Sequence, residues 1–337
     1  MNVLYVGNKL AVHGGALTGI EILGPLLEAS GYKLRYASSQ RNKARRLAEM
    51  LLATFKNRKW AHFVLIDTYS TSNFWYAVAV AGLCRIFKVP YVPILHGGNL
   101  PFRLVHSPRA SASLFGGARI NVAPSGYLKK AFADAGFRVR AVPNPISTDK
   151  FPFKNREVAA PKLLWVRALG PMSNPAMAIR TLAEITKAHP YATMAMVGPD
   201  KAGITPELRQ MADALGVKVQ FTGSLSQAQW SGLSTEFDIF INTSTVDNAP
   251  FSLVEAMSLG LFVVSTDVGG IPFVAADGAD AVLVPANDHI AMAAAVLRIM
   301  GDSGLRKKLQ IGAREKSHRF SPEAVIPKWD EILQGAL

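Results

Sequence analysis

Two acidic residues in the segment 242–266 (NTSTVDNAPFSLVEAMSLGLFVVST) have the spacing that points most directly to chemistry. Asp247 falls in a polar loop, and Glu255 follows eight positions later, in a helix expected to begin near Ser252 and to end at Gly260. A helix N-terminus presents free N–H groups and a partial positive charge, which suits a phosphate. A carboxylate one turn into the helix suits the paired hydroxyls of a ribose. The spacing alone is equally compatible with an ordinary capped helix that carries solvent-exposed acids.

A basic residue stands at the end of another apolar run. Arg167 closes the run KLLWVRA (162–168), and Asn174 lies in the turn that should lead into a helix over 176–187. A guanidinium at a strand end can bind a diphosphate through two parallel hydrogen bonds. Taken alone, Arg167 would by default be interpreted as a surface arginine.

Adjacent glycines follow two of the apolar runs in the first half of the chain. The sequence HGGA occupies 13–16, and HGG occupies 96–98. Glycine pairs let the backbone approach a ligand closely at the start of a helix. His96 could be a core histidine at a strand end, but its place beside two glycines favours a ligand contact.

Several common motifs are absent from the sequence. There is no G-x-G-x-x-G dinucleotide fingerprint and no G-x-x-x-x-G-K-[ST] phosphate loop, so a nicotinamide enzyme or an ATPase of that type is not supported. There is no G-x-S-x-G elbow for a serine hydrolase. No Asp-x-Asp pair and no histidine pair with metal spacing occurs, so we expect neither a catalytic metal nor a cofactor.

The elements that must position these residues are short strands separated by helical stretches. The apolar, β-branched runs recur at intervals too long for hairpins, which predicts parallel sheets covered by helices on both faces. Six runs lie in each half of the chain, so we expect an α/β protein with two doubly wound, Rossmann-like domains. Their ligand should bind beyond the carboxyl ends of the strands and between the domains. The runs are 3–7, 33–38, 62–68, 90–96, 119–125, 139–145, 162–168, 192–198, 217–223, 237–244, 261–267 and 281–287.

A proline-rich segment divides the two sets of strands. The stretch 142–153 (VPNPISTDKFPF) has three prolines and no helical period, as expected of a linker. We therefore expect domains over 1–145 and 146–319. The pattern alone does not assign the last helical segment, which begins at Pro322, to either domain.

Composition excludes several classes of protein. The 337 residues are 49% hydrophobic and include a single cysteine, Cys84, so neither a disordered chain nor a disulfide framework is expected. The longest apolar run, 74–84, is too short to span a bilayer, and the first residues do not resemble a signal peptide, which favours a cytoplasmic protein. Residues 1–150 carry 20 Lys and Arg against 6 Asp and Glu, whereas residues 151–337 carry 17 against 18. The basic half predicts an anionic partner.

The order of these motifs resembles that of the retaining nucleotide-sugar glycosyltransferases of the GT-B fold, the large family 4 of glycosyltransferases. The likeness covers nearly the whole chain and is strongest over 140–290. The residues that carry it are the GG loop, HGG, VPNPISTDKF, VRALGPMSNP, VGPD, FTGSLS, DNAPFSLVEAMSLG and VVSTDVGGIP.

The resemblance implies a role for each motif. Glu255 would bind the donor ribose, Asp247 would contact the transferred sugar, and Arg167 would bind the diphosphate. His96 would touch the donor sugar, and the terminal helix over 320–337 would cross back to the first domain. The remaining donor contacts would come from Gly14, Gly15, Asn174, Ser224, Leu225, Asn248, Ala249, Pro250, Phe251 and Ser252.

Three positions depart from the family pattern. Asp247 is one methylene shorter than the usual glutamate, and Phe273 stands where glutamate is common. The lysine that usually partners the arginine is missing near Asn174, which leaves one cation fewer for the leaving group.

The resemblance implies transfer of a sugar from a nucleotide-diphosphate donor, with UDP the expected nucleotide, to a glycan or lipid-linked acceptor with retention of configuration. Arg167 and the helix N-terminus would replace a metal, since neither metal nor cofactor is indicated. The first domain, being basic, would bind the acceptor, and we expect no nucleic-acid partner. The rival functions are a nucleotide-sugar epimerase or hydrolase of the same fold, and a basic protein that binds nucleic acid or nucleotide sugars without catalysis.

The stretch 39–60 predicts a basic, amphipathic helix. Leu47, Met50, Leu51 and Phe55 fall at helical spacing among seven Lys and Arg residues. Such a helix can lie on an anionic membrane, which would place the protein at the inner face of the membrane. An ordinary helix with its apolar stripe in the core explains the pattern equally well.

Overall fold

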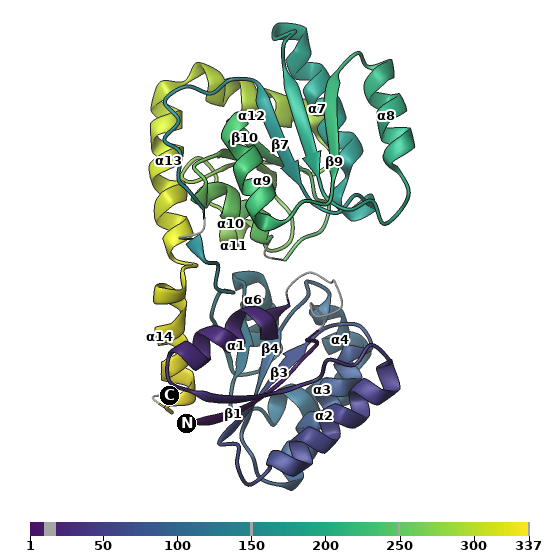
Figure 1. Ribbon diagram of the computed structural model, residues 1–337, viewed down its shortest axis with the longest axis vertical. Helices are drawn as coiled ribbons and strands as arrows, with labels where there is room; N and C mark the ends of the chain where they lie inside the picture. The colour runs from purple at the N-terminus through teal and green to yellow at the C-terminus, as the bar shows by residue number, and fades with distance from the viewer. Residues whose placement is uncertain (10–17, 149–150, 249, 336–337) are drawn as a thin grey trace. The chain divides into compact units, whose positions relative to one another are not determined.

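All twelve expected strands are present, and they form two parallel sheets (Figure 1). The fold comes from a computed structural model, which describes residues 1–9, 18–148, 151–248 and 250–335. The chain divides into two compact units, Met1–Pro145 with Pro322–Leu337, and Ile146–Ser321. Each unit is a doubly wound, Rossmann-like domain.

The first unit contains a sheet with the strand order β2-β1-β3-β4-β5-β6. Because the chain first adds β2 on one side of β1 and then β3 on the other, the order reverses between β1 and β3. Loops at the carboxyl ends of strands diverge at such a switch point and leave room for a ligand. The strands are β1 (Asn2–Val6), β2 (Lys33–Ala37), β3 (Phe63–Thr68), β4 (Tyr91–Leu95), β5 (Asn121–Ala123) and β6 (Val139–Ala141).

Helices cover both faces of this sheet, including the last helix of the chain. In Figure 1 α14, in yellow, lies beside α1, in purple. The Tyr32 hydroxyl donates to Asp330 Oδ1 at 2.7 Å, and Trp329 is buried in the core beneath α1. The terminal helix therefore crosses back to the first unit. The helices are α1 (Gly19–Ala29), α2 (Lys43–Asn57), α3 (Asn73–Ile86), α4 (Leu100–His106), α5 (Pro108–Ser111), the π-helical turn η2 (Ala112–Gly116), α6 (Gly126–Asp134) and α14 (Pro322–Leu333).

The second unit repeats the plan with the strand order β12-β11-β10-β7-β8-β9. Its order reverses between β7 and β10, which are hydrogen-bonded neighbours. The strands are β7 (Lys162–Val166), β8 (Thr193–Val197), β9 (Lys218–Gly223), β10 (Ile239–Asn242), β11 (Phe262–Thr266) and β12 (Val282–Val284).

The helices of the second unit begin and end at the residues that local chemistry favours. Asn174 caps the start of α7, where Pro175 occupies the first helical position, and the Ser226 side chain caps α9. Gly260, at φ +74°, ends α10 in the left-handed conformation. The helical elements are η4 (Pro171–Ser173), α7 (Pro175–Ala188), α8 (Thr205–Ala214), α9 (Gln227–Leu233), η5 (Ser234–Glu236), α10 (Phe251–Ser258), α11 (Ile271–Val274), α12 (His289–Gly301) and α13 (Ser303–His318).

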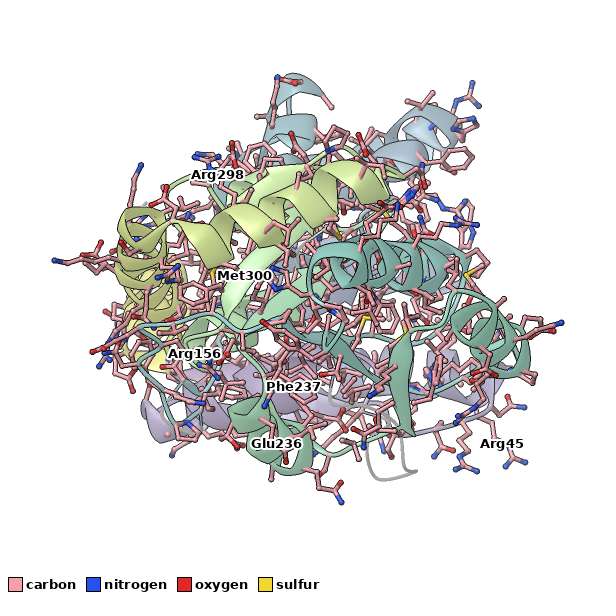
Figure 2. The ribbon with its side chains drawn as sticks, turned by 90° about the horizontal axis from the view of Figure 1, so that it is seen from above. Arg45, Arg156, Glu236, Phe237, Arg298 and Met300 are labelled. Carbon is pink, nitrogen blue, oxygen red and sulfur yellow. The ribbon has the colours of Figure 1, made fainter. Side chains whose placement is uncertain are left out.

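A buried arginine fixes the beginning of the second unit. The Arg156 guanidinium, labelled beside Phe237 in Figure 2, donates to the Phe237 carbonyl at 3.1 Å and to the Leu259 carbonyl at 2.7 Å. Asp238 Oδ1 lies 3.3 Å from Arg156 Nε. Because a buried cation is stable only when paired and hydrogen-bonded, these contacts anchor the segment that leads into β7.

The amphipathic stretch 39–60 forms α2, and most of its apolar stripe faces the core. Met50 is buried, and Leu47 and Leu51 pack against the same core. Phe55 remains exposed. The interpretation of the whole stripe as a membrane-facing surface is therefore wrong, because three of its four members pack against the core. Over the residues that the structure describes, no helix is both long enough and apolar enough to span a membrane.

Candidate functional site

The predicted site residues of the second unit converge at the switch point of its sheet. Arg167 follows β7 directly, and Asp247 lies in the loop after β10. Because β7 and β10 are parallel neighbours, their carboxyl ends lie at the same edge. Arg167 Nη1 donates to Asp247 Oδ2, which joins the two loops across the switch point.

The Arg167–Asp247 pair is asymmetric in its exposure. The Asp247 side chain is 10% exposed and that of Arg167 is 29% exposed. Burial raises the pKa of Asp247 above its ordinary value, although the Arg167 guanidinium and the Asn248 N–H, which donates to Asp247 Oδ1 at 2.8 Å, act in the opposite direction. The guanidinium therefore keeps donors that face the solvent, where an anion can reach them.

Two glycine positions allow these loops to approach one another. At Gly198, with φ +148°, a Cβ would lie 1.7 Å from the Arg167 carbonyl oxygen. At Gly270 a Cβ would lie 1.7 Å from the Asn248 carbonyl oxygen, and the Gly270 N–H donates to the Asp247 carbonyl at 2.9 Å. Since the neighbouring atoms are backbone, no side-chain movement could make room for another residue at either position.

The start of α10 lies beside this pair. The helix begins at Phe251, one residue before the expected start, and Pro250 precedes it in the extended conformation. Ser252 is half-buried in the first turn. The first N–H groups of a helix have no partner within it, so they can receive an anion at this end. Asn248 completes the loop, while Ala249 lies outside the described residues.

Glu255 projects from the second turn of α10 and meets a residue that the sequence analysis missed. Glu255 Oε1 accepts a hydrogen bond from Gln227 Nε2 at 2.9 Å. Burial raises the pKa of Glu255 and the Gln227 amide lowers it, with a net rise. Gln227 opens α9, directly after the FTGSLS turn, in which Ser224 is exposed and Leu225 is half-buried. The sequence signal that could have identified Gln227 was its position as a polar residue directly after this predicted binding turn.

Asn174 has a structural task at the start of α7. It adopts the left-handed conformation (φ +47°), accepts a hydrogen bond from the Met177 N–H at 3.3 Å and donates from Nδ2 to Asn287 Oδ1 at 2.9 Å. These bonds place it at the same edge of the sheet. Its contact with a donor stays a prediction.

In the first unit His96 forms a pair that the sequence analysis also missed. His96 follows β4, and its Nε2 lies 2.7 Å from Oδ1 of Asp67, near the end of β3. The Tyr5 hydroxyl donates to the same oxygen at 3.1 Å. The carboxylate near the end of the apolar run HFVLIDT is visible in the sequence, but nothing there indicates that His96 is its partner. The predicted contacts Gly14 and Gly15 lie outside the described residues.

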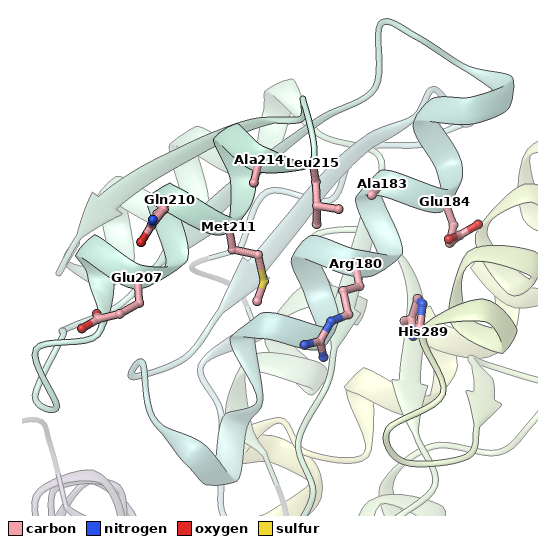
Figure 3. A pocket seen from close by; sticks show the side chains of 9 residues that line it. All are labelled: Arg180, Ala183, Glu184, Glu207, Gln210, Met211, Ala214, Leu215 and His289. Atoms are coloured by element: carbon pink, nitrogen blue, oxygen red, sulfur yellow. The ribbon is translucent and has the colours of Figure 1, made fainter.

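A groove in the second unit lies away from these residues. It has a volume of about 680 Å³ and lies along α7 and α8 beside the start of α12 (Figure 3). None of the predicted site residues lines it. Elsewhere in the described chain, no group of three or more His, Cys, Asp and Glu side chains could hold a metal ion. The expectation that the reaction uses no metal stays a prediction.

The arrangement in the second unit combines a partly exposed guanidinium, a helix N-terminus and a half-buried carboxylate. A comparison with known families gives this combination a context. The family model described as Glycosyl transferases group 1 matches residues 147–316, about half of the chain. The chain belongs to the group 1 glycosyl transferases. The match contains Arg167, Asp247, Glu255 and Gln227.

Curated relatives share part of the chain. The phosphatidyl-myo-inositol mannosyltransferase of Mycolicibacterium smegmatis is 29% identical over 217 residues, which are 63% of this chain and 52% of that protein. The exopolysaccharide phosphotransferase SCO2592 of Streptomyces coelicolor is 27% identical over 213 residues, which are 61% of this chain and 22% of that protein. The chain therefore spans about half of the first relative and a smaller part of the second.

The whole fold has solved counterparts. The Anabaena protein Alr3699/HepE, solved in complex with UDP, superposes on this chain with a TM-score of 0.80 at 19% sequence identity. The superposition covers 99% of this chain and 100% of the Anabaena chain. At this identity the likeness establishes the fold. Together with the family match it identifies the fold as GT-B.

Proposed function

We propose that this chain transfers a glycosyl group from a nucleotide-diphosphate sugar to a hydroxyl of a glycan or lipid-linked acceptor, with retention at the anomeric carbon. The observation that supports this most is the convergence of Arg167, the α10 N-terminus and Glu255 at the switch point of one parallel sheet. Family membership supports the same class of reaction.

The reaction exchanges one bond of the anomeric carbon for another. The bond to the diphosphate oxygen breaks, and its electron pair leaves with the diphosphate. A new bond forms to the acceptor oxygen, whose proton passes to an oxygen of the departing diphosphate. The enzyme must stabilise the charge that develops on the diphosphate, and preorganised donors do this most effectively.

Each site residue receives one task in this proposal. Arg167 and the first N–H groups of α10 bind the diphosphate, and Asp247 both orients Arg167 and contacts the transferred sugar. Glu255 accepts hydrogen bonds from the ribose hydroxyls, with Gln227 holding its second oxygen. His96 contacts the donor sugar.

The donor and acceptor classes rest on the comparisons. The Anabaena protein was solved with UDP and with UDP-glucose, so a uridine nucleotide is the donor that we propose. The name of the Mycolicibacterium relative describes transfer of mannose to a phosphatidyl-inositol, which supports a lipid-linked acceptor.

A nucleotide-binding experiment tests the donor site. Titration calorimetry with UDP and other nucleoside diphosphates should detect binding by the wild type and a loss of at least tenfold in affinity for Arg167→Gln, because one charge-assisted contact is worth about 1.5–3 kcal/mol. The matched control is Arg180→Gln, which removes an exposed arginine of α7 in the groove of Figure 3. Equal affinities of wild type and Arg167→Gln for every nucleotide would refute the site.

We also propose that the first unit binds an anionic membrane surface on the cytoplasmic side. The exposed apolar residues Leu52 and Phe55 of α2 and Ile86 of α3 are 51%, 45% and 71% exposed. Phe55 packs edge-on against Phe87 with ring centroids 5.7 Å apart, which joins the two helix ends. The neighbouring cations in the chain are Lys56, Arg58, Lys59 and Lys88. This patch is smaller than the whole helix face and lies where α2 and α3 end.

Vesicle sedimentation tests this surface. The wild type should sediment with phosphatidylglycerol vesicles, and less so as salt rises, because each basic residue near the surface contributes about 1 kcal/mol. Phe55→Ser should weaken binding, while Val158→Ser, which changes an exposed apolar residue of the second unit, should not. Failure to bind anionic vesicles, or equal binding by both variants, would overturn the membrane proposal.

A further inference from the structure

A buried acid, Asp67, lies behind His96 and takes no part in the roles assigned so far. The geometry points to Asp67 as the positioning residue of His96: it fixes the tautomer and orientation of the imidazole that faces the donor sugar. This inference rests on the proposed function for its effect on catalysis, but its structural content can be measured separately.

The hydrogen bond between the two side chains determines which ring nitrogen carries a proton. Asp67 Oδ1 lies 2.7 Å from His96 Nε2. Because an ionised carboxylate can only accept, Nε2 carries the hydrogen, and Nδ1 remains as the acceptor of the neutral ring. The Asp67 side chain is fully buried, whereas that of His96 is 11% exposed. The histidine alone therefore reaches the surface, and the acid acts from behind it.

The imidazole is held on two further sides. The Tyr69 ring stacks on it with centroids 5.1 Å apart at an interplanar angle of 25°. A Cβ at Gly19, the first residue of α1, would lie 2.7 Å from His96 Cε1. The ring is thus packed between Tyr69 and the start of α1, which leaves little freedom for rotation.

Asp67 is itself fixed by its surroundings. The Tyr5 hydroxyl donates to Oδ1 at 3.1 Å, whereas Oδ2 is buried with no hydrogen-bond partner among the described residues. Asp67 lines a small cavity of about 10 Å³ together with Asn8 and Asn73. A Cβ at Gly7 would lie 2.4 Å from Oδ2, so only glycine leaves room for the carboxylate.

Other titratable groups face this pair from three elements. They are Tyr5 of β1, Tyr69 after β3 and Glu21 of α1. Burial and the Asp67 charge raise the pKa of both tyrosines, so these remain neutral hydroxyls over the working range of pH. Of the described side chains with a printed contact to His96, Asp67 is the acid and Tyr69 is a neutral ring.

The first test reads the tautomer directly and does not need activity. Nitrogen chemical shifts of ¹⁵N-histidine-labelled protein, with His96 assigned by His96→Gln, should show the neutral ring protonated at Nε2. Asp67→Asn should populate the Nδ1–H form, because the amide can donate to Nε2 where the carboxylate could not. Tyr5→Phe, which removes the other bond to Oδ1, should leave the tautomer unchanged. An unaltered tautomer in Asp67→Asn would overturn the inference.

The second test separates positioning from mere stabilisation. Asp67→Asn should reduce kcat about 10–100-fold, the size of the loss when the hydrogen-bond partner that orients a metal-bound histidine is removed, with little change in the Kd for UDP. In the His96→Gln background the same substitution should have no further effect on kcat. Additive losses would show that Asp67 acts only on stability and would overturn the inference. If the wild type transfers no sugar, the proposed function fails, while the NMR result still decides whether Asp67 positions His96.

Discussion

Replacement of Glu255 by alanine separates the contribution of this carboxylate to ligand binding from its contribution to stability. One carboxylate oxygen is held by Gln227 Nε2 at 2.9 Å, which leaves the other oxygen and one lone pair for the ribose. A hydrogen bond to a charged group contributes about 1.5–3 kcal/mol, so the loss of two ribose contacts should weaken nucleotide binding by at least about 3 kcal/mol. This corresponds to a rise in Kd of about 150-fold.

The same substitution should not destabilise the fold to a similar degree. Burial raises the pKa of Glu255, which means that the fold holds the ionised carboxylate at a cost in free energy. Glu255→Gln keeps the shape and removes the charge, so its free energy of unfolding at neutral pH should equal or exceed that of the wild type. A residue that serves binding at the expense of stability has this signature.

Titration calorimetry with UDP and urea denaturation at neutral pH measure the two quantities. Glu207→Ala is the matched control, because Glu207 is an exposed glutamate of α8 in the same unit. It should change neither the Kd nor the stability beyond a few tenths of a kcal/mol. If Glu255→Ala bound UDP as tightly as the wild type, the assignment of the carboxylate to the ribose would be refuted.

Three further predictions follow from the same contacts. Gly270→Ala should abolish UDP binding in calorimetry, because its Cβ would meet the Asn248 carbonyl oxygen at 1.7 Å and displace the loop; unchanged binding would show that the loop can move freely. Trp329→Ala should lower the free energy of unfolding of the first unit by about 3–5 kcal/mol in denaturant titrations, since the side chain is 2% exposed, and a small loss would mean that α14 is dispensable. Burial raises the pKa of Glu255, so the stability that this group contributes is full below its unfolded pKa of about 4 and is lost as pH rises through its pKa in the folded protein. Urea denaturation should therefore show the wild type losing stability relative to Glu255→Gln between acid and neutral pH. A constant difference in the free energy of unfolding would contradict the pKa shift.

The strands and the main site residues could be predicted from the sequence because both are local patterns. Apolar runs at intervals too long for hairpins predict parallel strands, and polar residues in the segments that follow them, such as Arg167 and Asp247, must lie near the carboxyl edge. The Asp67–His96 pair could not be predicted in this way. It joins the ends of two strands, and a single acid in an apolar run carries no indication of its partner.

Other features depended on distances that a sequence does not contain. Gly198 and Gly270 are visible as letters, but only the fold shows which carbonyl each of them approaches. The apolar stripe of α2 shows a second limit of the sequence. A helix that lies on a membrane and a helix that packs on a core have the same pattern of apolar residues. Packing of Met50 and its neighbours decided between them.

The most direct test of the central claim follows the anomeric proton of a UDP-α-linked sugar by NMR in the presence of the protein and candidate lipid or glycan acceptors. The account predicts that the signal of the donor decays, that UDP appears in equal amount, and that the first sugar product formed is the α anomer. It also predicts that Arg167→Gln is inactive while Arg180→Gln retains activity. A first product of β configuration would contradict retention. Equal consumption of the donor by Arg167→Gln and the wild type would contradict the site itself.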